Sequence, residues 1–216
     1  VESGTVTSPA KIVASSPQAS GNSFVQFSPV TTPPTFSGIL FGSNVPDRPP
    51  VATSDVLGAV ETQIGRQFDI VRHFRSSWSN SFSQELTYAN QGYVVHTSYK
   101  PWASWKQTSD DLRTPGSARR TEVENMARAM QTQMPGPFFI TINHEPEDDI
   151  DAAAGKSEQD YSDMFCAFYF VFKSVGNTKA KFAPIPIIDS YVSNQSKGAK
   201  IFPGDQCIDW NGADAY

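Results

Sequence analysis

One dense group of ionisable residues follows directly on a strongly apolar run. Residues 138–144 read FFITINH, and residues 145–149 read EPEDD. A carboxylate that leaves a buried strand and precedes a proline projects from the end of the sheet, where it can donate and accept protons. Glu145 is therefore a candidate catalytic residue, and His144 beside it is a candidate substrate contact. The plainer alternative is a solvated acidic loop.

Other chemistries are less well supported by the sequence. His144 offers a nitrogen ligand and the four carboxylates after it offer oxygen ligands, so a metal-dependent hydrolase is a further, weaker hypothesis. The segment lacks the spacing of a calcium loop, and no second histidine lies at zinc-ligand spacing, so we expect no metal and no cofactor. The chain also lacks a G-x-S-x-G nucleophile motif and a phosphate-binding loop.

Short apolar runs alternate with helical patterns along the chain. The runs are residues 39–42, 68–74, 93–99, 138–144, 182–188 and 207–213, and helical spacing covers 53–65, 123–134 and 158–175. The aromatic stripe of the last helix is typical of core packing. Alternation of this kind predicts an α/β fold with a parallel sheet, either an open doubly wound sheet or a barrel.

The positions of polar residues favour the barrel. Residues 42–46 lack the glycine spacing of a dinucleotide-binding turn. His73, Lys100 and Asp214 fall at the carboxyl ends of runs, which is the edge that carries the chemistry of barrel enzymes. We predict a (β/α)₈ TIM barrel, of which about six βα units are present in this chain.

Composition excludes two classes of function. Acidic residues outnumber basic ones 22 to 17 and the net charge is -5, so binding of nucleic acid by bulk charge is not expected. No run approaches about 18 apolar residues, so no membrane span is expected either. Residues 1–35 are rich in Ser, Thr, Pro and Gly and predict a linker or extended arm before a domain at 36–216. Such linkers favour a secreted protein.

Several motifs together resemble a known family. They are HEPED at 144–148, a helix containing residues 161–164, FPGDQCIDWNGADAY at 202–216, SYKPW at 98–102 and GRQFDIV at 65–71. The first three motifs, which follow one another in this order along the chain, and the two supporting ones resemble glycoside hydrolase family 26, which contains β-mannanases and their relatives, over roughly residues 36–216.

The resemblance implies a retaining double displacement by two glutamates on a (β/α)₈ barrel. Glu145 matches the general acid/base, and His144 the histidine that holds the site or contacts sugar hydroxyls. Tyr216 matches a tyrosine expected near the nucleophile. Lys100, Trp102 and Trp105 are candidate substrate contacts, the two tryptophans as stacking platforms with a core or lid role as the alternative. The implied partner is a β-linked polysaccharide or oligosaccharide.

Two departures from the family pattern shape these expectations. Residues 146–151 carry no tryptophan after the acid/base, so other β-glycans stay open beside mannan. The family's nucleophile ends a seventh strand, whereas this sequence ends at Tyr216 within the sixth. We therefore expect strands seven and eight, with the nucleophile, in a missing C-terminal segment or another chain. The alternative is a non-catalytic carbohydrate-binding relative that has lost the nucleophile.

The two cysteines admit two interpretations. Cys166 falls on the helix at 158–175 and Cys207 at the start of the sixth run. They form a disulfide in an exported protein, or they are separate buried thiols.

Overall fold

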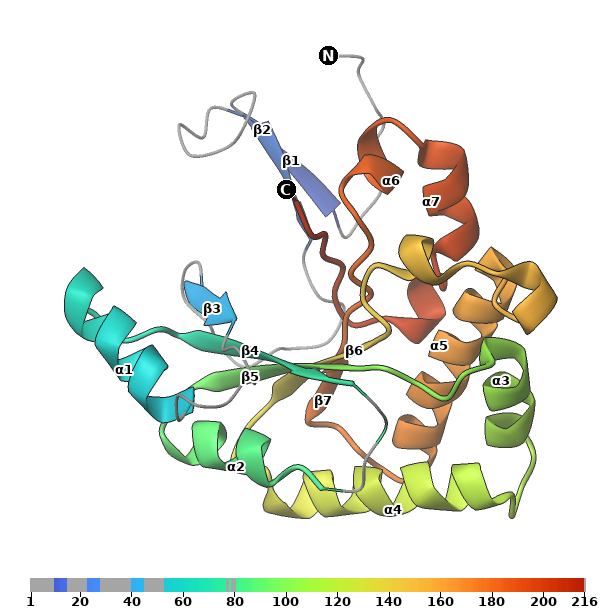
Figure 1. Cartoon of the computed structure of the whole chain (residues 1–216), viewed down its shortest axis with the longest axis horizontal. Coiled ribbons are helices and arrows are strands. Elements are labelled where there is room, and N and C mark those ends of the chain that lie inside the picture. Colours follow the sequence, from blue (N-terminus) through green and yellow to red (C-terminus); the bar gives the residue numbers. More distant parts are fainter. Residues whose placement is uncertain are drawn as a thin grey trace.

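The core of the molecule is a five-stranded parallel sheet in the order β3-β4-β5-β6-β7 (Figure 1). This computed structural model describes residues 10–14, 23–27, 40–44, 53–76, 78 and 81–215. The strands are β3 (Gly42–Asn44), β4 (Ile70–Arg75), β5 (Val94–Tyr99), β6 (Phe138–Ile142) and β7 (Ala180–Phe182). Sequential neighbours pair throughout, as in the register Ile70↔Val94 between β4 and β5. This confirms the α/β class predicted from the alternating pattern.

The sixth apolar run lies alongside β7 as an extended, paired segment. The amides of Trp210, Gly212 and Asp214 donate to the carbonyls of Phe182, Pro184 and Pro186 at 3.1, 3.2 and 3.0 Å. Only an isolated parallel bridge, Ile187↔Asp214, is formed between these described segments. Pro184 and Pro186 have no N–H to give back on that side, and this explains why the segment pairs without becoming a regular strand.

The longer helices lie around one face of the sheet in Figure 1. The main ones are α1 (Thr53–Ile64), α2 (Ser83–Asn90), α3 (Trp105–Arg113), α4 (Ala118–Gln133) and α5 (Glu158–Ser174). The short helices α6 (Asp189–Val192) and α7 (Gln195–Ile201) follow β7, and 3₁₀ turns cover Pro146–Asp149, Ala152–Ala154 and Asp205–Cys207.

Helix α5 supplies most of the aromatic core. A capping box between Ser157 and Asp160 begins the helix. Phe165 and Phe172 of its buried stripe pack edge-on against Phe182 of β7, at 5.8 and 5.2 Å between ring centroids. The stripe is core packing, as the sequence predicts.

Helix α3 lies between the third and fourth apolar runs, in a segment where the sequence shows no helical spacing before residue 123. Ser104 caps it by accepting a hydrogen bond from the Gln107 amide, and Trp105, Thr108 and Leu112 form its buried face. Two of the four buried positions carry hydroxyl groups, so the apolar periodicity is too weak to see in the sequence.

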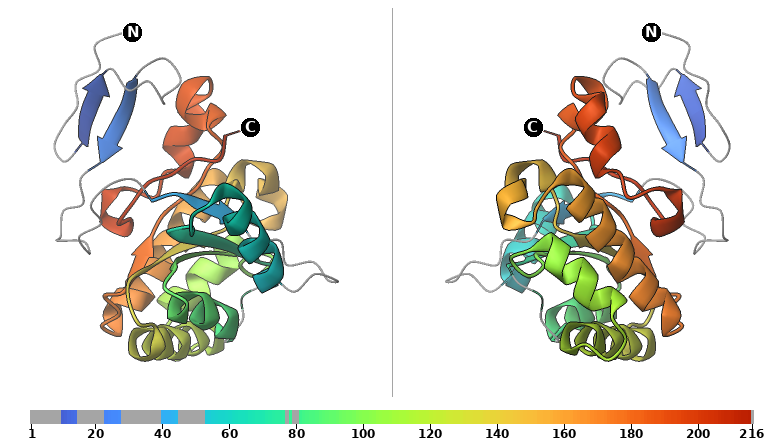
Figure 2. Two further views of the ribbon diagram at one scale, coloured as in Figure 1. Left: turned by 90° about the vertical axis from the view of Figure 1, so that its left-hand side faces the viewer. Right: turned by 90° about the vertical axis from the view of Figure 1, so that its right-hand side faces the viewer.

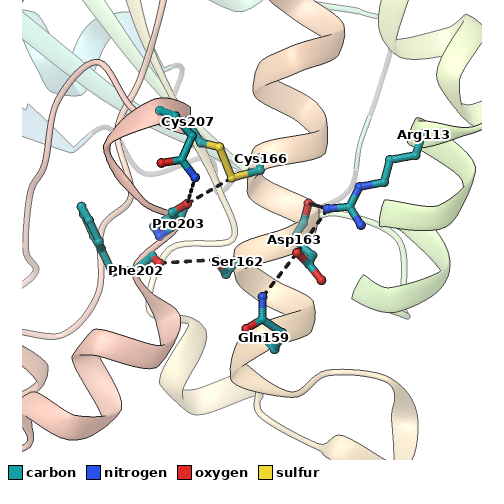
Figure 3. The surroundings of a disulfide bond; sticks show 9 residues. Arg113, Gln159, Ser162, Asp163, Cys166, Phe202, Pro203 and Cys207 are labelled. Atoms are coloured by element: carbon teal, nitrogen blue, oxygen red, sulfur yellow. Dashed lines mark hydrogen bonds and ion pairs between the residues drawn. A yellow bond between two sulfur atoms is a disulfide. The ribbon is translucent and has the colours of Figure 1, made fainter.

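The two cysteines form a disulfide, Cys166–Cys207, which joins α5 to the 3₁₀ turn before residue 208 (Figure 3). The Cys166 sulfur also lies 3.1 Å from the Pro203 carbonyl oxygen. A disulfide sulfur carries no hydrogen, so this is a close contact rather than a hydrogen bond. Of the two interpretations of the cysteines, the structure has the bonded pair.

The two faces of the sheet are covered to different extents. On the helix-covered face, Val71, Val95, Ile140 and Phe182 are at most 1% exposed. The alternate residues form the inner face, where Arg72, His96, Phe139 and Lys181 are only half-buried. The chemistry of this protein therefore has to be sought on the inner face and at its carboxyl edge.

The N-terminal segment contains a separate antiparallel hairpin of β1 (Ala10–Ala14) and β2 (Ser23–Phe27) (Figure 2). It lies within residues 1–35, which the sequence predicts to be a linker or arm without strand periodicity. Part of that arm is thus regular structure, while the domain boundary after residue 35 stays a prediction. In the part of the chain that the structure describes, no helix has the length and apolar character needed to cross a membrane.

Candidate active site

The backbone at the end of β6 adopts an unusual conformation. Asn143 and Glu145 have φ angles of 52° and 50°, and they are the only positive-φ residues other than glycine among the described residues. A left-handed conformation costs a branched or long side chain about 1 to 3 kcal/mol and persists where the surroundings enforce it. These two left-handed residues flank His144 directly after the end of β6.

Contacts with the next strand fix Glu145 in place. Its amide donates to the carbonyl of Ile185 at 2.7 Å, so the residue is held against the extension of β7. Its side chain is 14% exposed, and its Oε2 lies 3.9 Å from Nε2 of His144. The glutamate is thus largely enclosed and has an imidazole as its neighbour, as a proton-transferring carboxyl needs.

A cleft of about 570 Å³, which we call the mouth cleft, opens at the carboxyl ends of β4, β5 and β6. Its volume suits a small polar ligand. Its lining residues are His73, Phe74, Arg75, Ser76, Gln84, Lys100, Asn143, His144 and Asp149. The sequence predicts both His144 and Lys100 as substrate contacts, and the structure brings them to the same cleft.

Asp149 forms a polar wall of the mouth cleft. Its carboxylate accepts hydrogen bonds from Asn143 Nδ2 at 3.1 Å and from Lys100 Nζ at 3.2 Å. Burial acts to raise its pKa, but the hydrogen bonds from Asn143 and Lys100 outweigh burial and the pKa is lowered. Asp149 is therefore an ionised acceptor next to the Lys100 ammonium, a combination suited to binding hydroxyl groups.

Glu147 has a structural role in the same loop. Its Oε1 accepts a hydrogen bond from the Ile187 amide at 3.1 Å and another from the Ser190 hydroxyl. These bonds join the loop after β6 to the loop after β7. The Glu147 carboxylate therefore holds the two loops together, and we do not assign it a catalytic role.

Below the cleft, a hydrogen-bonded chain crosses the inner face. Thr141 Oγ1 donates to the Ala183 carbonyl at 2.6 Å, so it must accept from His96 Nε2, which lies 2.8 Å away. His96 is therefore the Nε2-protonated neutral tautomer. Burial, with Arg72 and His144 nearby, lowers its pKa to about 3.

Glu145 adjoins the lining residue His144 but does not itself line the mouth cleft, and the predicted contacts Trp102 and Trp105 lie outside it as well. Trp105 is 1% exposed and packs edge-on against Tyr161 at 5.5 Å. Trp102 stacks with Phe168 at 6.3 Å between ring centroids, and the Arg119 guanidinium lies 5.0 Å from its ring. Both positions favour the core alternative over a stacking platform. Tyr216 lies outside the described residues.

Sequence reasoning missed Arg72, which faces the inner side of β4, and it named Asp149 only as one of several acidic residues. The charge of Asp149 after the apolar run was a usable signal. Arg72 gave none, because it stands inside a strand. Among the described residues, no group of three or more His, Cys, Asp or Glu side chains could hold a metal ion.

Comparison with known proteins places this geometry on a known fold. No protein-family model and no curated protein matches the sequence. Among solved structures, a β-mannanase from a symbiotic protist of the termite Reticulitermes speratus, complexed with gluco-manno-oligosaccharide, matches with a TM-score of 0.59 at 12% identity. The GH26 domain of an endo-β-mannanase/endo-β-glucanase from Prevotella bryantii matches with 0.56 at 11%, and a GH26 β-mannanase from Bacteroides ovatus with 0.53 at 15%.

These matches cover 82–83% of this chain but only 62–67% of those proteins. The chain therefore spans about two thirds of the length of each neighbour. The family predicted from the sequence motifs is the family of these structural neighbours. Over that shared length, the chain has the (β/α) barrel fold of the glycoside hydrolase family 26 β-mannanases.

Proposed function

We propose that this chain is the acid/base-bearing part of a retaining glycoside hydrolase that cleaves β-linked polysaccharide, mannan first among the candidates. The observation that carries the proposal is the position of Glu145. The residue is enclosed beside His144 at the carboxyl end of β6, in a left-handed conformation that the strand end enforces, on a fold shared with β-mannanases.

The chemistry assigned to Glu145 has two steps. In the first, its carboxyl proton passes to the glycosidic oxygen as the sugar–oxygen bond breaks and a nucleophilic carboxylate bonds to the sugar. In the second, the Glu145 carboxylate takes a proton from water, whose oxygen displaces the nucleophile. We propose that the nucleophile lies in the part of the barrel that this chain does not share with its neighbours, of whose length it covers 62–67%, on the same polypeptide or on another chain.

The mouth cleft provides the recognition of the sugar. Among its lining residues, Phe74 and His144 offer ring surface, and Asp149 and Lys100 offer hydrogen-bond partners for hydroxyl groups. Pyranose rings need both kinds of surface. The Bacteroides and termite-protist neighbours are mannanases, and the Prevotella neighbour also has endo-β-glucanase in its description, so glucan is the second candidate.

The test is Glu145→Ala in the longest natural chain, assayed on mannan, mixed-linkage glucan and xylan. We expect turnover on the preferred glycan to fall by about 10³-fold or more, and to fall much less on aryl glycosides whose leaving groups need no proton. Asp148→Asn is the matched control, because Asp148 is an exposed carboxylate of the same loop. Equal losses on both kinds of substrate would contradict the acid/base role, and binding without hydrolysis by the unmodified protein would favour the carbohydrate-binding alternative.

We also propose that the protein is secreted. The Cys166–Cys207 disulfide supports this, since such bonds persist in oxidising compartments. Titration of thiols in unfolded protein purified without reductant is expected to find none, and two free thiols would contradict the proposal.

A further inference from the structure

An ion pair crosses the inner face from β4 to the segment beside β7. Arg72 Nη1 donates to Asp214 Oδ1 at 2.5 Å, and Nη2 donates to Oδ2 at 3.1 Å. Both side chains are 18% exposed, so the pair is mostly shielded from water. Two parallel bonds fix the plane of the guanidinium as well as its position.

The Arg72 guanidinium is linked to the candidate active site through one ring. Its Cζ lies 4.6 Å from the centroid of Phe74, the next residue on the same face of β4. The His144 ring packs on Phe74 with 4.6 Å between centroids and a tilt of 56°. Phe74 therefore joins Arg72 to His144, and His144 is the neighbour of Glu145.

Four charged groups act on the His144 imidazole. Burial is the first cause of its lowered pKa, and Arg72 is the second. The carboxylates of Glu145 and Asp214 act in the opposite sense, and Lys100 adds a further lowering effect. His96, on the neighbouring strand, is also affected by Arg72 and by His144. Arg72 is thus the strongest charge in the surroundings of His144.

We propose that Arg72, fixed by Asp214, is a positioning residue that keeps the His144 imidazole neutral and seated on Phe74 beside Glu145. The inference rests on the acid/base role proposed for Glu145. An imidazolium 3.9 Å from Glu145 would favour the ionised carboxylate and so remove the proton that the first step needs. Asp214 holds the guanidinium in place without cancelling its effect, because Arg72 acts more strongly on His144 than Asp214 does.

The test follows the His144 ring by NMR titration without any glycan, with the signal assigned by its loss in His144→Asn. In Arg72→Met the His144 pKa is expected to rise by about one pH unit, since a cation is removed and the side-chain bulk over Phe74 is kept. Asp214→Asn removes an anion, while the amide oxygen can still accept the Nη1 hydrogen bond that keeps Arg72 in place, so the His144 pKa is expected to fall. Arg72→Lys keeps the charge, and the pKa is expected to stay within about 0.3 of the starting value.

Opposite shifts in Arg72→Met and Asp214→Asn distinguish electrostatic positioning from a merely structural role, which would move both in the same direction. Arg113→Met, which breaks the exposed Arg113–Asp163 pair, is the control and should leave His144 unchanged. An unchanged His144 in Arg72→Met, or shifts of the same sign, would overturn the proposal. If Arg72→Met does not fold, Asp214→Asn alone decides, and a raised or unchanged pKa overturns it.

Activity separates this proposal from the one on which it rests. In a hydrolytically active natural chain, Arg72→Met should move the acid limb of the kcat/KM profile to higher pH by the same amount as the NMR titration. If the His144 pKa shifts in opposite directions in Arg72→Met and Asp214→Asn, but the unmodified protein hydrolyses none of the three glycans, the proposed function is rejected and the coupling between Arg72 and His144 is retained.

Discussion

The two faces of the sheet are built from alternate residues of the same strands, and they differ in composition and burial. Val71, Ile140 and Phe182 on the helix-covered face are apolar and fully buried. Arg72 and His96 on the inner face are charged or titratable, half-buried and tied into hydrogen bonds that cross strands. Stability comes mainly from the helix-covered face, and this allows the inner face to carry groups that a core would exclude.

The strained residues fit this division. Both non-glycine residues with positive φ among the described residues lie at the carboxyl end of β6, beside the mouth cleft. The helix-covered side, by contrast, holds the disulfide and the edge-on aromatic contacts between α5 and β7. Changes on the helix-covered side should therefore alter stability and leave the site unaffected. Changes on the inner face should alter pH dependence or substrate binding.

The largest effect is expected from the disulfide. Replacing Cys166 and Cys207 together by serine opens a loop whose ends are 41 residues apart in sequence. The unfolded chain gains conformational entropy, so the free energy of unfolding should fall by about 4 kcal/mol. The urea midpoint should fall accordingly, while the His144 titration stays unchanged because Asp214 is still held by its bonds to Pro186 and Arg72. The other contacts of α5, from Ser162 to the Phe202 carbonyl and from Asp163 to Arg113, remain in place (Figure 3).

Reductant provides the control for this variant. Dithiothreitol should lower the midpoint of the unmodified protein to that of the double variant and should leave the variant itself unaffected. A double variant with normal stability but an altered His144 titration would contradict the assignment of stability to the helix-covered face and of pH dependence to the inner face.

The second effect concerns His96 and pH. Its pKa is lowered from 6.5 to about 3 in the folded protein, so below pH 6.5 the unfolded chain binds a proton that the folded chain does not. The free energy of unfolding should therefore decrease as pH falls, by about 2 kcal/mol between pH 7 and pH 5 from this residue. Urea unfolding at both pH values measures the difference.

His96→Gln supplies the comparison, since an amide can still donate to Thr141 and does not titrate. The variant should lose about 2 kcal/mol of the pH dependence and keep the part that comes from His144 and other groups. Equal pH dependence in the two proteins would show that His96 does not stay neutral on the inner face.

The sequence predicted more of the helix-covered face than of the inner face. Continuous apolar runs marked β4, β5 and β6, and the aromatic stripe marked α5, because burial on that face leaves a periodic pattern. The Arg72–Asp214 pair joins residues 142 positions apart and depends on how the sheet curves, so nothing local indicates it. The position of Glu145 was predicted from the run before it, but its left-handed conformation was not.

The smallest effect is expected at the mouth cleft itself. Asp149→Asn removes the charge that holds Lys100 and weakens the link to Asn143, so Lys100 is free to leave the cleft wall. Because the pair is partly exposed, the cost in stability should be about 1 kcal/mol or less. KM for the preferred oligosaccharide should rise about fivefold with kcat nearly unchanged, since the interaction acts on bound substrate and transition state alike.

Asp163→Asn is the matched change outside the cleft, because it breaks the Arg113–Asp163 pair, whose side chains are similarly exposed. It should cost a similar amount of stability and leave KM unaltered. If both variants raised KM equally, the effect would come from general surface charge rather than from the cleft. If Asp149→Asn lowered kcat as much as kcat/KM, Asp149 would act in the transition state, and the catalytic machinery would extend from Glu145 across the cleft to its polar wall.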